Sequence, residues 1–594
     1  MLSLEQLLTV SSAVPADVRD DGTTLVRWNV PGTFQLYLTR PGLTPEQLTS
    51  LSEPVDGRFV PGGDRILLSV DEGGNERAQL YLTRAVAGAK LEPLVVEPEF
   101  LHVTPALSAD GTQLAYSCNR ANGRDLDVYV RSLETSAERC VLAAQSYCEV
   151  AGFSPDGRRL AVLRLTERTG DNDLDLIDLS TGEVVVVAPE EDDAFFGAPA
   201  WSADSESFLF ATDSGRDVAG IARYELTTDR WEYVLEDDWD LDCVGAPSGA
   251  LVAVSANVDG ASRLELRDFS TLATVADVPL PELGVVEPIR LSPTGSHLAY
   301  GFSSPRSSWE TWRLATDGGE PERLTESPVA VPSGSLFRPT LRRLSSFDGE
   351  SIPYFLTEPA TDGPWPVVID IHGGPEAQRQ AIWLPFVQYL ASSGYAVAQP
   401  NVRGSTGYGK RYEHLDDVRL RLDTVRDLAS LHDELVRDER VDAGRTILYG
   451  GSYGGYMVLA GLAFEPERWA AGIGVVAISS LVTFLRNTSD YRRAFREREY
   501  GSLEHDLDFL HEVSPLTHVG RIRAPLLLVH GANDPRVPVS EAEQLHRTLG
   551  ERGVPCELVV YADEGHGLQK LGSRLDAYPR MVEFLDRHVR TPTA

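Results

Sequence analysis

A serine flanked by glycines, between an expected strand and an expected helix, is the first candidate for a reactive group. Residues 446–456 read Thr-Ile-Leu-Tyr-Gly-Gly-Ser-Tyr-Gly-Gly-Tyr, which places Ser452 in a G-x-S-x-G pattern. A serine hydroxyl is a weak nucleophile, and a tight exposed turn presents it to a base while the next N–H stays free to hold an oxyanion. We interpret Ser452 as a nucleophile; the alternative is a glycine-rich turn with an incidental serine.

Two further residues follow Ser452 in the order acid, then histidine. Asp534 comes after the apolar run 526–529, and His566 comes after the next such run, between two glycines. In such an arrangement the histidine accepts the serine proton, and the aspartate fixes the tautomer and stabilises the imidazolium. The order predicts a triad of Ser452, Asp534 and His566.

Three other residues are of a type that could fill these roles. Asp563 and Glu564 are carboxylates, but each is too near His566 in sequence to be the expected partner of its ring. His530 precedes Asp534, whereas the histidine should follow the acid, so we expect it to support the loop. The remaining histidines show no ligand spacing, and we predict no metal site and no cofactor.

The oxyanion hole needs two backbone donors, and the sequence offers a place for each. Tyr453 N–H follows the nucleophile directly. The segment 372–375, His-Gly-Gly-Pro, follows the apolar run 367–371, and its glycines would let the backbone approach a substrate carbonyl. A plain turn is the alternative reading of that segment.

A strand-rich repeat occupies the first half of the chain, residues 16–328. Each copy has a small turn with glycine and then an apolar strand. The turn positions, which lie 41 to 48 residues apart, are Gly22, Gly63, Gly111, Gly157, Ser205, Gly249 and Gly295. A period of this length is typical of a propeller with about four strands per blade. Seven copies predict a seven-bladed β-propeller; an array of β-sandwiches is the alternative.

The second half of the chain has a different pattern. In residues 335–594, apolar runs alternate with helical stretches, which predicts an α/β-hydrolase domain with a mostly parallel sheet. The expected strands are 367–371, 396–398, 446–449, 526–529 and 558–561. Residues 328–334 read as a linker, and residues 1–15 as a short helix that packs on the α/β domain.

Composition and charge restrict the partners. A chain of 594 residues is too long for one core, and its formal charge of −35 repels phosphate backbones, so we expect no nucleic-acid partner. No apolar run approaches the roughly 20 residues of a membrane helix, and the start lacks a signal-peptide pattern, so we expect no membrane association. Five cysteines without C-x-x-C spacing fit free thiols in the cytoplasm.

The combined motifs resemble the prolyl oligopeptidase family (S9) of serine peptidases, most closely its acylaminoacyl-peptidase branch. The resemblance rests on the propeller and on the segments 372–375, 401–409, 450–456, 533–538 and 564–567. It implies cleavage of short peptides, a propeller that excludes folded proteins, and a homo-oligomer. True prolyl oligopeptidases use a tyrosine hydroxyl where His372 stands, so the second oxyanion donor should be Gly374 N–H, and strict prolyl specificity is not expected.

The same resemblance implies two further groups of functional residues. Arg536 should pair with Glu76 of the propeller; a solvated Glu76 is the alternative. Arg492, Arg493 and Arg496 lie between nucleophile and acid, where some bacterial members that release C-terminal residues carry substrate-facing arginines. A guanidinium fork suits a carboxylate. The alternative is an exposed helix face in ion pairs with its own acidic residues.

The substrate side chain that precedes the cleaved peptide bond would need an apolar pocket, for which Ile478 and Phe484 are candidates; both could equally belong to the core.

The favoured function is a peptidase of short, blocked or free peptides that acts through an acyl-enzyme, with a carboxypeptidase-like preference. An esterase or amidase of a small metabolite would use the same triad. An aminopeptidase would use the acidic run 190–193 for a free amine, and a non-catalytic propeller scaffold would not need the triad.

Overall fold

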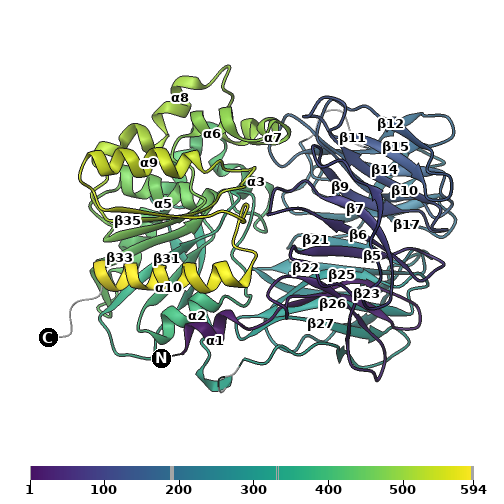
Figure 1. Ribbon diagram of the computed structural model, residues 1–594, viewed down its shortest axis with the longest axis horizontal. Helices are drawn as coiled ribbons and strands as arrows, with labels where there is room; N and C mark the ends of the chain where they lie inside the picture. Colours follow the sequence, from purple (N-terminus) through teal and green to yellow (C-terminus); the bar gives the residue numbers. More distant parts are fainter. Residues whose placement is uncertain (1, 188–192, 330, 332, 590–594) are drawn as a thin grey trace.

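The structure is a computed structural model that describes residues 2–187, 193–329, 331 and 333–589. Two domains lie side by side: an all-β propeller and an α/β domain that contains all the longer helices (Figure 1). Within the described residues the propeller has seven four-stranded sheets, each built from four consecutive strands. The predicted seven-bladed propeller with an α/β-hydrolase domain is therefore confirmed.

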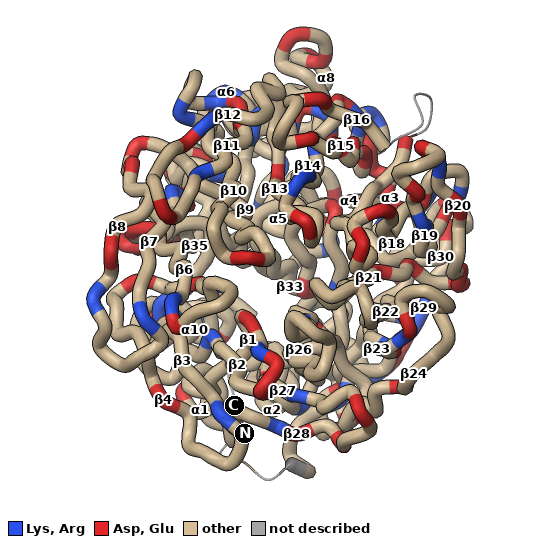
Figure 2. The backbone as a smooth tube through the Cα atoms, turned by 90° about the vertical axis from the view of Figure 1, so that its right-hand side faces the viewer, with Lys and Arg blue, Asp and Glu red and all other residues tan. Residues whose placement is uncertain are grey.

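Figure 2 shows the propeller sheets arranged in a ring. Blade by blade, the strands are β1 (Ala13–Val18), β2 (Thr24–Trp28), β3 (Gln35–Thr39), β4 (Glu46–Gln47); β5 (Val55–Phe59), β6 (Arg65–Val70), β7 (Gln79–Arg84), β8 (Glu92–Val95); β9 (His102–Leu107), β10 (Gln113–Cys118), β11 (Asp127–Ser132), β12 (Glu138–Leu142); β13 (Cys148–Phe153), β14 (Arg159–Leu165), β15 (Asn172–Asp178), β16 (Val184–Val186); β17 (Ala200–Trp201), β18 (Ser207–Thr212), β19 (Gly220–Glu225), β20 (Arg230–Leu235); β21 (Leu241–Gly245), β22 (Leu251–Val258), β23 (Ala261–Asp268), β24 (Thr274–Asp277); β25 (Val285–Leu291), β26 (His297–Ser304), β27 (Ser307–Ala315), β28 (Glu322–Arg323).

The repeated turns join the first and second strand of each blade. A positive φ is found at the expected residue in six blades, namely at Gly22, Gly111, Gly157, Ser205, Gly249 and Gly295. In the second blade it falls on Gly62 instead of Gly63, so the repeat was misplaced there by one residue. Ser205 adopts φ 62° without being glycine, which explains how the degenerate copy still forms the turn.

The ring closes by contact between the first and the last blade. Strand β1 packs against β25, β26 and β27. Asp20 accepts hydrogen bonds from the backbone N–H and the hydroxyl of Thr294 at 2.8 and 2.7 Å, and Arg290 donates to the carbonyl of Ala16 at 3.0 Å. Because these bonds join segments about half the chain apart in sequence, they hold the ring shut without a strand shared between its ends.

The α/β domain is built on one sheet with the order β29-β30-β32-β31-β33-β34-β35-β36, parallel from β32 to β36. Its strands are β29 (Thr340–Ser345), β30 (Ser351–Thr357), β31 (Trp365–Ile371), β32 (Ala396–Pro400), β33 (Val441–Gly451), β34 (Ala471–Val475), β35 (Leu526–Gly531) and β36 (Cys556–Tyr561). The five expected strands are present, and β29, β30 and β34 are additional.

Helices cover both faces of this sheet (Figure 1). They are α1 (Leu4–Leu8), α2 (Pro385–Ser392), α3 (Lys410–Glu413), α4 (Arg421–Leu435), α5 (Tyr453–Phe464), α6 (Leu481–Asn487), α7 (Asp490–Tyr500), α8 (Leu507–Glu512), α9 (Ser540–Glu551) and α10 (Leu571–His588), with 3-10 turns η1 (Ser333–Ser335), η2 (His414–Asp416), η3 (Val418–Leu420) and η4 (Pro515–Arg521). Helix α1 packs on α2 and α10. We propose the domain limits 1–15, 16–328 and 335–594, although strand β1 begins slightly earlier, at Ala13.

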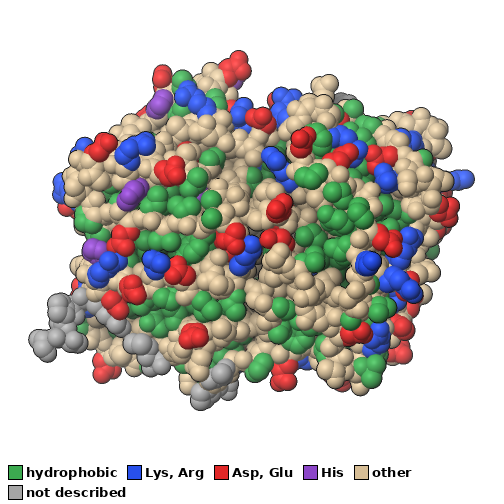
Figure 3. Space-filling model, in the orientation of Figure 1, with side chains coloured by type: hydrophobic (Ala, Val, Ile, Leu, Met, Phe, Trp, Pro, Cys, Tyr) green, Lys and Arg blue, Asp and Glu red, His purple; other side chains and the backbone are tan. Residues whose placement is uncertain are grey.

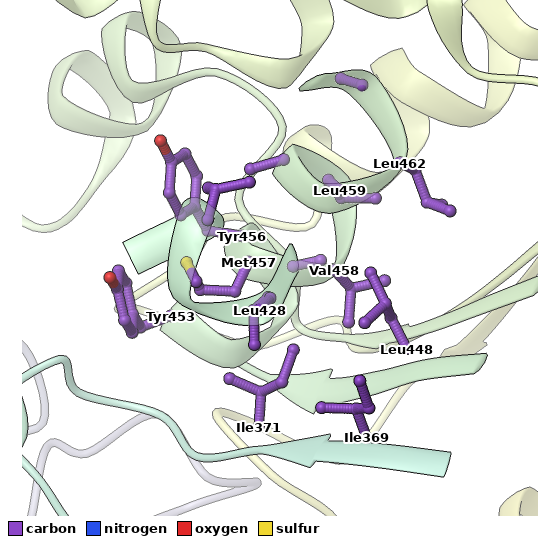
Figure 4. Packing of buried hydrophobic residues seen from close by; sticks show 14 of the residues in the cluster. Ile369, Ile371, Leu428, Leu448, Tyr453, Tyr456, Met457, Val458, Leu459 and Leu462 are labelled. Atoms are coloured by element: carbon purple, nitrogen blue, oxygen red, sulfur yellow. The ribbon is translucent and has the colours of Figure 1, made fainter. Parts of the chain in front are cut away.

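Helix α5 is buried on all sides in the core of the α/β domain. In Figure 4 Met457 and Val458 of this helix lie near Leu428 of α4 and near Ile369, Ile371 and Leu448 of the sheet. A helix that is apolar all round is typical of a fully enclosed position. Its first turn, which carries the candidate nucleophile, is therefore held by the core itself.

On the face shown in Figure 3, acidic and basic side chains are interspersed over both domains. Among the described helices, none combines the length and the apolar content that a membrane crossing requires.

Candidate active site

Ser452 stands between β33 and α5 with φ 56° and ψ −117°, a strained backbone for a residue with a Cβ atom. The turn is tight because two glycines permit it. A Cβ atom on Gly450 would lie 2.5 Å from the carbonyl oxygen of Gly454, and one on Gly454 would lie 2.4 Å from that of Ile371. This strand-to-helix turn lifts the serine side chain away from the sheet, as the G-x-S-x-G pattern predicts.

The three predicted triad residues come together. The Oγ atom of Ser452 lies 3.0 Å from Nε2 of His566, and Nδ1 of His566 lies 2.7 Å from Oδ2 of Asp534. The second carboxylate oxygen of Asp534 accepts the backbone N–H groups of Arg536 and Val537 at 2.8 and 2.9 Å. These bonds fix the orientation of the Asp534 carboxylate, with Oδ2 directed at the ring, so the arrangement can transfer the serine proton to His566.

The residues weighed as alternatives have other partners. Nε2 of His530 lies 2.8 Å from the carbonyl oxygen of Val537, and its ring is buried. Asp563 pairs with Lys570 at 3.2 Å, and Glu564 accepts the backbone N–H groups of Gln569 and Lys570 at 3.0 Å each. They therefore support the loops beside the triad.

The loop after β31 reaches the nucleophile. A Cβ atom on Gly373 would lie 3.2 Å from the carbonyl oxygen of Gly451 and 3.5 Å from Cβ of Ser452, so the loop passes directly beside the nucleophile. Nδ1 and Nε2 of His372 lie 2.7 Å from the Gly373 carbonyl and 2.8 Å from the Ser405 hydroxyl, and burial lowers the pKa of His372 to about 4. A neutral, enclosed ring thus fixes the loop that carries the expected donor Gly374.

A buried ion network lies under the first turn of α5, and sequence reasoning missed it. Arg421 is fully enclosed between the carboxylates of Asp416 and Glu499, and the Tyr453 hydroxyl lies 3.1 Å from Asp416 Oδ2. Burial raises the pKa of Asp416, and it raises that of Glu499 to about 7. Because Tyr453 supplies an expected oxyanion donor, this network positions the site from below.

A hairpin of the second blade crosses to the triad loops. Its Glu76 forms an ion pair with Arg536 and accepts the Tyr491 hydroxyl at 3.0 Å. The carbonyl of Gly73 accepts a hydrogen bond from Asn533, which precedes Asp534, at 3.0 Å. The structure thus brings Glu76 and Arg536 together, and the propeller contacts the loop of the triad acid directly.

The three arginines of α7 differ in their surroundings. Arg493 donates to the carbonyl of Leu485 and pairs with Asp490 at 2.8 and 2.9 Å. Arg496 donates to the carbonyl of Gly374 at 3.3 Å. The pKa of Arg492 is lowered, mainly because the group is buried and also because the positive charges of Arg496 and Arg536 are near. Within the described part of the chain, neither Arg492 nor Arg496 has a carboxylate oxygen within 4.0 Å. Arg496 therefore contacts the oxyanion loop without a paired carboxylate, and Arg492 lies close enough to feel the charges of Arg496 and Glu76.

The expected apolar pocket residues are enclosed in the core. Ile478 and Phe484 are 1% and 3% exposed, and the ring of Phe484 contacts that of Tyr500. Their role in substrate binding stays a prediction. Of the acidic run 190–193, residues 190–192 lie outside the described residues, and Asp193 pairs with Arg168.

An acidic cavity of about 600 Å³ lies near α3 and is lined by residues of both domains. Its basic side chains are Lys410, His414 and Arg498. They are outnumbered by its acidic side chains, which are Asp171, Asp193, Asp213, Asp240, Asp242, Glu376 and Glu413. Burial raises the pKa of Asp213 to about 6 and, together with the charge of Glu376, that of Glu413 to about 8.

Glu413→Gln should therefore change the pH dependence of stability. A carboxyl group whose pKa is raised in the folded state stabilises the protein below its ordinary pKa, and this contribution is lost as the pH rises through the folded value. With about 1.4 kcal/mol per pKa unit and a rise from 4.5 to about 8, we expect the variant to be more stable than wild type by about 5 kcal/mol at pH 9 and equal to it near pH 4. Calorimetric Tm values from pH 4 to 9 measure this; parallel curves for the two proteins would contradict it.

Comparison with known proteins agrees with this geometry. Residues 386–591 match the model of the prolyl oligopeptidase family, and residues 55–326 match that of the prolyl oligopeptidase N-terminal β-propeller domain. Dipeptidyl aminopeptidase BIII of Pseudoxanthomonas mexicana is 26% identical over 85% of this chain and 76% of its own length. The acylamino-acid-releasing enzyme of Rattus norvegicus is 27% identical over 41% of this chain and 34% of its own length.

The fold recurs in solved structures. The crystal structure of a puromycin hydrolase superposes with a TM-score of 0.85 over 98% of this chain and 96% of the other, at 20% identity. At that identity the likeness shows the fold alone. The two family models together cover most of the chain, so the chain belongs to the prolyl oligopeptidase family and is a serine peptidase.

Proposed function

We propose that this peptidase hydrolyses short peptides through an acyl-enzyme and that Arg492 and Arg496 hold the C-terminal carboxylate of the substrate. The observation that carries the second part is that neither guanidinium has a carboxylate oxygen within 4.0 Å in the described residues, while Arg496 contacts the loop that lies against Ser452. Cations in a partly desolvated position favour an anionic ligand, and a planar fork suits a carboxylate.

In the proposed mechanism, Ser452 Oγ attacks the substrate carbonyl carbon while His566 Nε2 takes its proton. The N–H groups of Tyr453 and Gly374 stabilise the oxyanion. His566 then protonates the leaving amine, and an acyl group remains on Ser452. Water, deprotonated by His566, attacks this ester, and the serine is regenerated.

The carboxylate proposal predicts a strong dependence on the substrate's C-terminus. Of two N-acylated dipeptides that differ only in a free or amidated C-terminus, we expect the free acid to have the higher kcat/KM. Arg492→Gln should reduce that ratio about 10–100-fold, mainly through KM, because a charge-assisted hydrogen bond is worth about 1.5–3 kcal/mol. Paired progress curves, with Ser452→Ala as the blank, measure the ratio.

Arg493→Gln is the matched control, since the same charge is removed from a side chain already paired with Asp490. We expect its ratio to equal that of wild type. Equal cleavage of acid and amide by the wild-type enzyme would refute the carboxylate proposal and leave the triad mechanism standing. Hydrolysis of simple esters but of neither peptide would favour the esterase or amidase alternative.

The relatives bear on blocked and free N-termini. One relative is named for the release of acylamino acids and another is a dipeptidyl aminopeptidase, and these names support both readings for this chain. We therefore propose that the N-terminus of the substrate is read less strictly than its C-terminus. A free-amine version of the same dipeptide tests this in the same assay.

Location and assembly belong to this proposal as well. All five cysteines are free thiols, which supports a reducing compartment such as the cytoplasm. A homo-oligomer is expected from the family resemblance, and sedimentation equilibrium of the purified chain decides it.

A further inference from the structure

We propose that Glu97, His102 and Cys118 form a binding site for a divalent cation of the zinc class in the propeller. One ligand atom from each residue lies within 4.8 Å of the others. The three side chains are outside the active site, and the proposed peptidase mechanism does not use them.

The fold brings these residues together at a blade junction. Cys118 is the last residue of β10 and faces His102, the first residue of β9, as its cross-strand partner. Glu97 lies in the connection from β8 of the preceding blade to β9, and its backbone N–H donates to Gln79 Oε1 at 2.6 Å. The group is therefore held by two neighbouring sheets, as a preorganised site requires.

His102 is oriented as a metal ligand. Its Nδ1 lies 2.9 Å from the carbonyl oxygen of Ala78, which can only accept, so Nδ1 carries the proton. The lone pair is then on Nε2. Among the described residues that atom has no hydrogen-bond partner; it is buried in a residue that is 1% exposed, and it lies toward Glu97. Metal-binding histidines commonly donate their other ring N–H to a carbonyl in this way.

Distances and ligand types both suit zinc. Nε2 of His102 lies 3.5 Å from Oε2 of Glu97. Two ligands each about 2.0–2.2 Å from a tetrahedral ion are about 3.4 Å apart. A thiolate, an imidazole and a carboxylate form a set that zinc accepts, with water as fourth ligand. His102 also lines the cavity of about 1540 Å³ that the first strands of the blades surround.

The local charges balance once the ion is bound. Binding requires the Cys118 thiol to lose its proton to solvent, so the ion, one thiolate and one carboxylate together carry no net charge. The nearby Arg120 already donates to Glu138 at 2.8 Å, and its Nε lies 3.3 Å from Glu97 Oε2. Arg120 faces the same Glu97 oxygen as His102 does, and its charge also acts on Cys118, so metal binding displaces this guanidinium from Glu97 and leaves it paired with Glu138.

The test uses the full chain, stripped of metal with a chelator and titrated with Co²⁺, whose bond to a thiolate gives a charge-transfer absorption band. We expect one Co²⁺ per chain, a band that Zn²⁺ abolishes, one proton released per ion, and a higher Tm. Cys118→Ser should remove the band. Cys148→Ser should keep it, because Cys148 is an equally buried thiol on β13 that lies outside the trio.

Glu97→Gln serves if the buried variants fail to fold, since the Glu97 side chain is 37% exposed. We expect it to weaken Co²⁺ binding at least about 10-fold. The proposal is overturned if the stripped wild-type chain takes up no Co²⁺, if Cys118→Ser keeps the band, or if Glu97→Gln binds with unchanged affinity.

Discussion

Ser452→Ala should lower kcat/KM for a peptide substrate by about 10⁴–10⁶-fold without loss of the fold. Loss of a triad nucleophile has an effect of this size because the base and the acid then have nothing to activate. Alanine keeps the Cβ atom, so the strained backbone at φ 56° is the same in both proteins and stability should change little. Steady-state kinetics on the free-acid dipeptide measure the loss.

The double variant Ser452→Ala/His566→Ala should be no slower than either single variant, because the members of a triad act as one unit. Asp563→Asn is the matched control: its carboxylate is exposed, lies three residues before His566, and pairs with Lys570. It should keep nearly full activity. A serine-directed fluorophosphonate should label wild type once per chain and leave Ser452→Ala unlabelled. Labelling of the alanine variant would mean that another residue is the nucleophile.

The architecture could be predicted because its determinants are local. Each blade repeats a turn that needs a residue with positive φ, and glycine marks that position in the sequence. The misplaced turn at Gly62 shows the limit, since two adjacent glycines are equivalent until the strands on either side are paired. Strand β34 was missed because two of its five residues are glycines, which are disfavoured in strands. This segment forms a strand because it is paired on both sides, with β33 and with β35.

The triad was predictable for a different reason: the order of its members along the chain follows from the order of the sheet. The surroundings of the arginines were not. Arg492 and Arg493 are neighbours in sequence, but only Arg493 faces Asp490, and that depends on how α7 packs. The network around Arg421 was invisible as well, because its members come from three helical segments with no common spacing.

That network carries the second large expectation. Arg421 has no exposed surface and lies between two carboxylates, with its guanidinium over the rings of Tyr453 and Tyr500. Replacing one partner of a buried ion pair leaves the other charge uncompensated, which typically costs about 3–5 kcal/mol. Arg421→Met keeps similar apolar bulk, so the loss of charge should dominate over the loss of packing.

The pH dependence identifies the cause. Burial already raises the pKa of Asp416 and that of Glu499 to about 7, and removal of the guanidinium removes the charge that opposes this rise. Both groups then bind protons more readily in the folded state than in the unfolded one, so the stability of Arg421→Met should fall as the pH rises from 5 toward 8, more steeply than that of wild type.

The triple variant Arg421→Met/Asp416→Asn/Glu499→Gln separates charge from packing. If unpaired carboxylates are the cause, it should regain much of the lost stability at pH 8, because neutral amides need no counterion. Calorimetry that resolves the two domains should show the change in the α/β transition. Peptidase activity should recover less, since the hydroxyl of Tyr453 would still lack its carboxylate partner in Asp416. A triple variant as unstable as Arg421→Met, with no pH dependence, would instead assign the loss to packing around Tyr453 and Tyr500.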